Sequence, residues 1–288
     1  MRIGAIFPQT EIGSDPSAVR DWAQAVEGMG YTHILAYDHV LGAGVAHRPS
    51  WDGPYTSESL FHEPFVLYGY LAGLTTRVEL VTGVIILPQR QTALVAKQAA
   101  EVDVLSSGRL RLGIGVGWNP IEYEALNEDF HNRGARSEEQ IHVLRALWTE
   151  PVVTFNGRWH HIDAAGINPL PVQRPIPIWL GGQAEALIAR VARIGDGWMP
   201  QGAPNDRARA TLDRLRDAIS IAGRKPEDVG IEARLTIARV ERAGWARYAE
   251  GWRALGATHL TINTMGAGLE APSDHIAALR QVKDTLGV

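Results

Sequence analysis

The residues with the clearest capacity for chemistry are Asp38 and His39, which follow an apolar run at positions 31–37. Histidine takes up and releases protons near neutral pH, so it is the natural acid or base of an enzyme. The place of His39 at the end of an expected strand, beside a carboxylate, favours a functional role. A histidine that only caps a loop would fit the same pattern, and this alternative stays open.

A glycine interrupts the third apolar run of the chain, at positions 78–87. Gly83 and Val84 lie inside this run, where a glycine often marks a bulge or the close approach of a ligand to the backbone. A demand for a small residue in barrel packing explains Gly83 equally well. We therefore treat Gly83 and Val84 as candidate ligand contacts.

Further glycines end the fourth apolar run, at positions 110–116. The spacing around Gly115 and Gly117 does not match the dinucleotide motif G-x-G-x-x-G, because Trp118 stands where the third glycine belongs. We expect instead that Gly115 and Gly117 let the backbone approach a flat ligand. Asn119 would be its hydrogen-bonding partner.

A third glycine pair, Gly181 and Gly182, is followed by Gln183 and by a helix expected from position 184. Free backbone N–H groups and the dipole at the start of a helix attract anions. The segment therefore predicts a phosphate site, although a plain turn between a strand and a helix has the same sequence features.

The composition excludes several classes of function. The chain of 288 residues carries a formal net charge of −4 and no cysteine, so nucleic-acid binding, membrane binding and thiolate chemistry are disfavoured. His160 and His161 would point opposite ways on a strand, and no H-E-x-x-H or G-x-S-x-G motif occurs, so we predict neither a metal site nor a serine hydrolase. The lack of cysteine, of a signal-peptide pattern and of a long apolar run predicts a cytoplasmic protein.

The candidate residues must be positioned by elements that alternate along the whole chain. We predict strands at 2–8, 31–37, 78–87, 110–116, 176–180, 197–199, 231–238 and 259–263, each followed by a helical pattern. Strands that alternate with helices form a parallel sheet, and eight such repeats in roughly 250 residues predict a single (β/α)8 barrel over residues 1–288. An open doubly wound sheet is the alternative, but no linker divides the chain into two halves.

Two irregular segments are expected as insertions into this barrel. One follows the second strand at 40–63, and its aromatic residues Trp51, Tyr55 and Phe61 favour a partly ordered lid. The other precedes the fifth strand at 151–175 and contains a hairpin signal at Asn156-Gly157. Because barrel enzymes keep their sites at the carboxyl ends of the strands, we expect the candidate residues to gather at one rim.

Several linked motifs together resemble one known family. The runs LSSGRLRLGIGVGWNPIEYEAL, RGAR, EEQIHVLRALW, PIWLGG and IGDGWMP occur in this order. They resemble the bacterial luciferase-like flavin and deazaflavin oxidoreductases, and above all the branch that depends on coenzyme F420. The resemblance covers nearly the whole chain and is clearest from Ile3 to about Met199.

This resemblance implies a (β/α)8 barrel, often dimeric, with F420 or FMN across the carboxyl ends of the strands. It implies a cofactor contact for Asp38, an active-site role for His39, a non-proline cis peptide at Gly83-Val84 and a phosphate contact at Gly181-Gly182. Trp118 departs from the pattern, because the sugar-phosphate dehydrogenases of this branch place a catalytic glutamate near that position. The departure argues against a sugar phosphate substrate.

The function that we predict is an F420-dependent oxidoreductase, in which a hydride passes between the deazaflavin and a small organic substrate under the 40–63 segment. His39 would donate or accept the proton, and Asp38 would fix the cofactor. An FMN-dependent monooxygenase is the first alternative, and a flavin- or deazaflavin-binding protein without turnover is the second. The expected assembly is a homodimer.

Overall fold

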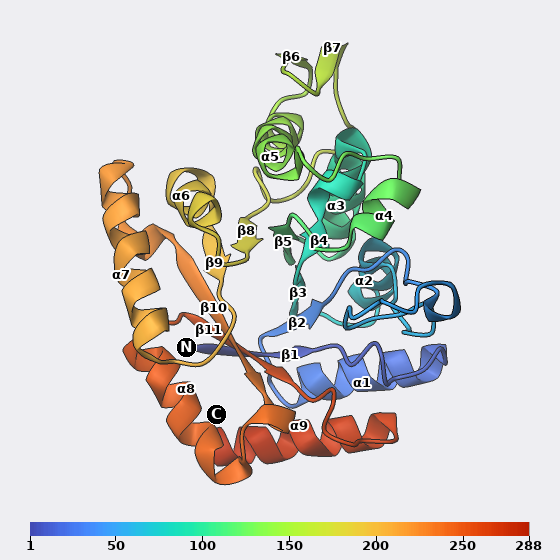
Figure 1. Cartoon of the computed structure of the whole chain (residues 1–288), viewed down its shortest axis with the longest axis vertical. Helices are drawn as coiled ribbons and strands as arrows, with labels where there is room; N and C mark the ends of the chain where they lie inside the picture. The colour runs from blue at the N-terminus through green and yellow to red at the C-terminus, as the bar shows by residue number, and fades with distance from the viewer. Residues whose placement is uncertain (288) are drawn as a thin grey trace.

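The computed structural model describes residues 1–287, and a closed ring of parallel strands forms its centre (Figure 1). The strands follow the order β3-β2-β1-β11-β10-β9-β8-β5-β4, and pairing of β3 with β5 closes the ring. The predicted (β/α)8 barrel is therefore confirmed. Its strands are β1 (Arg2–Ile6), β2 (His33–Ala36), β3 (Glu79–Thr82), β4 (Ile85–Ile86), β5 (Leu110–Gly115), β8 (Ile178–Gly181), β9 (Gly197–Met199), β10 (Gly230–Thr236) and β11 (His259–Asn263).

Helices surround this ring and cover its outer face (Figure 1). The first helices begin at prolines behind a capping carboxylate: the Asp15 side chain accepts a hydrogen bond from the backbone N–H of Ser17, and Glu63 accepts one from Val66. The helices are α1 (Pro16–Gly28), α2 (Pro64–Ala72), α3 (Thr92–Leu105), α4 (Pro120–Ala125), α5 (Arg133–Thr149), α6 (Glu185–Ile194), α7 (Asp206–Ile221), α8 (Trp245–Ala254) and α9 (Pro272–Leu286).

Several elements differ from their predicted bounds. Strand β2 covers only His33–Ala36 of the predicted range 31–37, and β10 ends at Thr236 rather than at position 238. The single strand predicted at 78–87 is two strands, β3 and β4, separated by Gly83 and Val84, whose peptide bond is cis. Gly83 leaves no space for a side chain, since a Cβ there would lie 2.3 Å from the Leu35 side chain.

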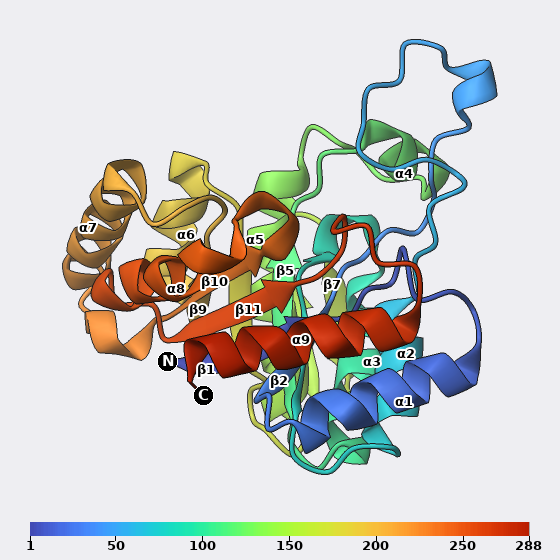
Figure 2. The ribbon, with the colours of Figure 1, turned by 90° about the horizontal axis from the view of Figure 1, so that it is seen from below.

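The first predicted insertion follows β2 and extends from the rim of the ring beside α4 (Figure 2). Within it a parallel bridge joins Ala43 to Thr56, and a short 3-10 helix covers Val45–His47. One end of the insertion continues from β2, and the other end leads into α2. The insertion is thus held at both ends by elements of the barrel.

The second predicted insertion contains the expected hairpin, formed by β6 (Val153–Asn156) and β7 (His161–Ala165). The backbone N–H of Gly157 donates to the carbonyl of His160 at 2.8 Å and closes the turn. Glu139 of α5 accepts the backbone N–H groups of Arg158, Trp159 and His160 and anchors the hairpin to that helix. The hairpin lies outside the ring, beyond α5 (Figure 1).

A network of charged side chains fills the interior of the ring. The Glu232 carboxylate pairs with Arg111, and one of its oxygens lies 2.8 Å from His33 Nε2. The Arg111 guanidinium also lies 4.2 Å from the centre of the Trp179 ring. Burial raises the pKa of Glu232, but Arg111 and His33 outweigh burial and hold this pKa well below its usual range. The buried carboxylate is therefore ionised and compensated.

Replacing Arg111 by methionine should lower the free energy of unfolding by about 3–5 kcal/mol, because the Glu232 charge would stay buried without its partner. Denaturation in urea, followed by circular dichroism, measures this loss. The exposed pair of Arg2 and Glu79, at 2.9 Å, provides the control. Arg2→Met should cost about 1 kcal/mol or less.

The same variant has a predicted pH dependence. The folded-state pKa of Glu232 lies below its unfolded value, so the wild-type carboxylate stabilises the fold above that value and loses this effect as the pH falls. The difference in stability between the wild type and Arg111→Met should therefore shrink below about pH 4. Equal losses for the two arginine variants would contradict a structural role of the network.

Candidate active site

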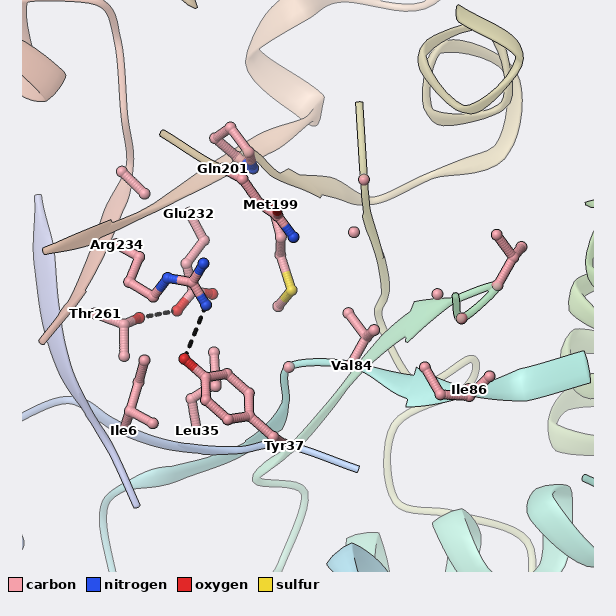
Figure 3. Close-up of a pocket in the computed structure, with 18 of the residues that line it drawn as sticks. Ile6, Leu35, Tyr37, Val84, Ile86, Met199, Gln201, Glu232, Arg234 and Thr261 are labelled. Atoms are coloured by element: carbon pink, nitrogen blue, oxygen red, sulfur yellow. Dashed lines mark hydrogen bonds between the residues drawn. The ribbon is translucent and has the colours of Figure 1, made fainter. Parts of the chain in front are cut away.

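A cavity of about 300 Å³ opens where the strands end at their carboxyl termini (Figure 3). Residues from distant parts of the sequence line it together, as expected for a barrel site. Those at its walls include Tyr37, Gly83, Val84, Gly115, Gly117, Trp118, Gly181, Gly182, Met199, Gln201, Glu232 and Arg234. Six of the ten candidates, all from the predicted glycine segments, thus lie at one site.

The glycines bring bare backbone against the side chain of Val84. A Cβ at Gly115 would lie 2.5 Å from Val84 Cγ2, and a Cβ at Gly181 would lie 2.7 Å from Val84 Cγ1. Val84 therefore occupies the space that side chains at Gly115 and Gly181 would need, and it lines the cavity opposite Met199 (Figure 3). This wall is smooth and apolar, which suits a flat ring system.

Asp38 differs from its predicted place, because its side chain does not line this cavity. The Asp38 carboxylate is buried and accepts hydrogen bonds from Arg90 Nη2 at 2.8 Å and from the backbone N–H of Ile86 at 2.9 Å. Arg90 also pairs with Glu63 at 2.9 Å. With both oxygens engaged, Asp38 ties the end of β2 to β4, and a cofactor contact of this residue stays a prediction.

Asn119 and Gln183 also lie outside the main cavity. The Asn119 side chain is buried and caps α4 by accepting a hydrogen bond from the backbone N–H of Ile121 at 3.0 Å. Gln183 lines a neighbouring cavity and donates its amide to the carbonyl of Gln201. Gln183 therefore helps to hold the loop after β9, whereas Asn119 holds the helix that follows Trp118.

His39 lines a separate pocket of about 260 Å³ under the first insertion. Its ring centre lies 4.8 Å from both Tyr55 and Phe61, and 5.9 Å from Trp118. Trp118 also lines the main cavity, so this residue is shared by the wall of that cavity and the surroundings of His39. His39 Nδ1 faces Glu122, whose nearest oxygen lies 3.3 Å away. His39 is thus close to the predicted rim, but it lines a pocket other than the main cavity.

Two polar residues of the cavity, Tyr37 and Arg234, were not among the predicted site residues. Arg234 Nη1 donates to Tyr37 Oη at 2.8 Å (Figure 3). Burial raises the pKa of Tyr37 more than the nearby Arg234 lowers it, so the phenol keeps its proton. One signal was available: Glu232 and Arg234 are two positions apart in an apolar strand, and such residues point to the same face.

A second, larger cavity of about 570 Å³ adjoins the first. Pro200, Gln201 and Arg234 line both, so the two form one continuous binding region. The second cavity is strongly basic, because its lining carries Arg207, Arg214, Arg234 and Arg239 against the single carboxylate of Glu185. Glu185 pairs with Arg214 at 3.1 Å, whereas Arg207 and Arg239 form no ion pair within residues 1–287.

The arrangement can hold a ligand that has a flat apolar part and an anionic extension. The apolar part fits against Val84, and the arginines attract the extension. Within residues 1–287, no helix is long and apolar enough to cross a bilayer.

Two curated relatives are enzymes that depend on FMNH2 or on F420. The chain is 32% identical over 235 residues, 80% of its own length and 60% of the relative's, to an FMNH2-dependent dimethylsulfone monooxygenase of Pseudomonas fluorescens. It is 30% identical over 227 residues, 74% of its own length and 61% of the relative's, to an F420-dependent glucose-6-phosphate dehydrogenase of Nakamurella multipartita.

The fold has a close counterpart among solved structures. An F420-dependent secondary alcohol dehydrogenase, in complex with an F420-acetone adduct, has a TM-score of 0.78 against this chain at 16% identity, with 99% of this chain and 98% of that chain covered. The sequence model of the luciferase-like monooxygenase family matches residues 2–285. This match confirms the resemblance seen in the sequence. The protein therefore belongs to the luciferase-like monooxygenase family of oxidoreductases.

Proposed function

We propose that the protein is an F420-dependent oxidoreductase that exchanges a hydride with a small organic substrate. The observation that carries this proposal is the continuity between the apolar cavity and the arginine-lined cavity. FMN ends in one phosphate, whereas the side chain of F420 continues beyond its phosphate into glutamate carboxylates. A basic cavity of about 570 Å³ beyond the ring site suits the longer, more anionic extension.

The residues of the site divide into groups that would hold different parts of the cofactor. Val84 and Met199 would support the ring, and the backbone of Gly181 and Gly182 would meet the phosphate at the start of α6. Arg207 and Arg239 would meet the carboxylates. When bound, the deazaflavin supplies the hydride chemistry, and the protein supplies orientation and electrostatics.

The protein's own contribution to the reaction is the movement of a proton at His39. In the direction of alcohol oxidation, His39 Nε2 accepts the hydroxyl proton of the substrate; in the reverse direction it returns a proton to the carbonyl oxygen. Tyr55 and Phe61 cover the histidine and exclude water from it. The substrate would lie between this histidine and the cavity, beneath the first insertion.

An FMN-dependent monooxygenase is the second candidate. It is favoured by the relative from Pseudomonas fluorescens, whose identity to this chain is about as high as that of the F420-dependent relative. The smooth wall at Val84 would accept either ring system. The arginine-lined cavity is what distinguishes the candidates, because FMN has no group that would extend into it beyond its phosphate.

The first prediction from this proposal concerns the choice of cofactor. The protein should bind F420 at least about tenfold more tightly than FMN, a difference of about 1.4 kcal/mol. The double variant Arg207→Gln/Arg239→Gln should lose most of that difference and leave FMN binding within about threefold, since two charges near the surface contribute about 1 kcal/mol in total. Fluorescence titration at low salt measures both affinities.

The control for this experiment is Arg242→Gln, which removes an exposed arginine that lines none of the described cavities. Its F420 affinity should equal that of the wild type. Tighter binding of FMN than of F420 by the wild type would overturn the cofactor choice in favour of the monooxygenase.

The second prediction concerns the wall at Val84. Gly115→Ala should weaken the binding of both F420 and FMN by about tenfold or more, because its methyl group would displace Val84 into the ring site. Gly69→Ala is the matched control: a Cβ there meets no atom within 4 Å, and alanine suits its helix. Unchanged affinities in Gly115→Ala would place the ring elsewhere.

The third prediction concerns His39. His39→Ala should lower kcat for alcohols, aldehydes or enones by about 10²–10⁴-fold, the usual contribution of an acid–base group. Cofactor affinity should stay unchanged, because His39 does not line the main cavity. His142→Ala, at an exposed position of α5, is the control. Unchanged turnover would exclude His39 from the reaction, and a wild type without turnover would favour a binding protein.

A further inference from the structure

We infer that Glu122 is the positioning residue of His39: its carboxylate accepts a hydrogen bond from Nδ1 and thereby makes Nε2 the atom that exchanges protons. This inference rests on the proposed function, in which His39 moves a proton. It assigns a role to a residue that the sequence motif contains but that lines neither large cavity.

The Glu122 carboxylate is almost completely enclosed, with 1% of its side chain exposed. Every group that approaches it is a donor or can be one. Oε1 accepts the backbone N–H of Val40 at 2.8 Å and of Leu41 at 3.2 Å, and Gln89 Nε2 lies 3.4 Å from Oε2. His39 Nδ1 lies 3.3 Å from each oxygen. The carboxylate therefore joins the histidine to the first residues of the insertion.

The contact with Glu122 fixes which nitrogen of the His39 ring carries the proton. Burial raises the pKa of Glu122, but the hydrogen bond and charge of His39, with the N–H groups of Leu41 and Val40, lower it below its usual range. An ionised carboxylate only accepts hydrogen bonds, so Nδ1 must carry the proton. In a neutral imidazole the other nitrogen, Nε2, is then unprotonated and able to act as a base.

The free nitrogen is available to a substrate. His39 Nε2 has no hydrogen-bond partner among the side chains and backbone groups of residues 1–287. The pocket of about 260 Å³ that His39 lines is mixed in character: Leu41, Tyr55 and Phe61 give it apolar walls, and polar residues complete the lining, namely Thr56, Ser57, Ser59 and Asn119. These walls suit an alcohol or carbonyl compound with a small apolar substituent, whose oxygen would face Nε2.

Glu122 could also be explained as a purely structural residue that holds the loop at Val40 and Leu41. The two roles differ in one measurable property, the tautomer of His39. A loop-holding carboxylate has no effect on which ring nitrogen carries the proton. A positioning carboxylate keeps the proton on Nδ1, and its removal releases this preference.

The decisive experiment is nitrogen-15 NMR of the His39 ring in the full-length protein, at a pH where the ring is neutral. The wild type should show the Nδ1–H tautomer. Glu122→Gln, which keeps an oxygen for the N–H groups of the loop, should show a mixture or the Nε2–H tautomer. Glu124→Gln, an exposed change on the same helix, should match the wild type.

Kinetics provide the second readout. Glu122→Gln should lower kcat by at least about tenfold, with KM and cofactor affinity within about threefold of the wild type. In the His39→Ala background the same change should have no further effect on kcat, because the two residues act as a unit.

An Nε2–H tautomer in the wild type, or identical His39 spectra of Glu122→Gln and Glu124→Gln, would overturn the inference. The wild-type spectrum decides by itself if Glu122→Gln does not fold. The NMR measurement needs neither substrate nor cofactor. A failure of the proposed oxidoreductase function would therefore appear as absent turnover with the Nδ1–H tautomer retained, and the two failures are distinguishable.

Discussion

The buried ion pair between Asp38 and Arg90 ties together three neighbouring elements at one side of the barrel rim, namely β2, β4 and α2. Arg90 joins Asp38, at the end of β2, to Glu63, at the start of α2, and these two residues are the ends of the first insertion. The second oxygen of Asp38 accepts the N–H of Ile86 in β4. Because a buried charge without its partner is strongly unfavourable, this pair fixes the insertion and the Val84 wall at the same time.

The two adjoining cavities of the site differ in the charge of the side chains that line them. The chain as a whole has a net charge of −4, yet the lining of the second cavity carries four arginines and one glutamate. Such a local reversal of sign attracts anionic ligands and orients them before contact. The apolar cavity next to it contains one buried carboxylate, Glu232, which Arg111 and His33 compensate, and one guanidinium, that of Arg234, which lines both cavities.

The fold could be predicted from the sequence because alternation of strands and helices is a local signal that repeats. The glycines at 83, 115, 117, 181 and 182 could be assigned to the candidate site because each ends or follows a strand, and parallel strands end at one rim. The contacts of the Asp38 side chain were harder to predict, because successive residues of an extended chain point to opposite sides and Asp38 faces away from the cavity that Tyr37 lines. The partners Arg90, Glu122 and Arg234 could not be predicted, since their contacts depend on how distant elements meet.

Trp118 and Glu122 together explain how this chain departs from its sugar-phosphate relatives. The resemblance places a catalytic glutamate near position 118, at the wall of the site, whereas this chain has an indole there that contacts both His39 and Trp51. In this chain the carboxylate that meets His39 belongs to Glu122 of α4, four positions after Trp118. It lies beside the His39 imidazole and does not line the cavity. In the proposed mechanism the acidic group therefore acts on the histidine instead of on the substrate. For the function that we propose, the aromatic wall at Trp118 favours an apolar substrate over a phosphorylated one.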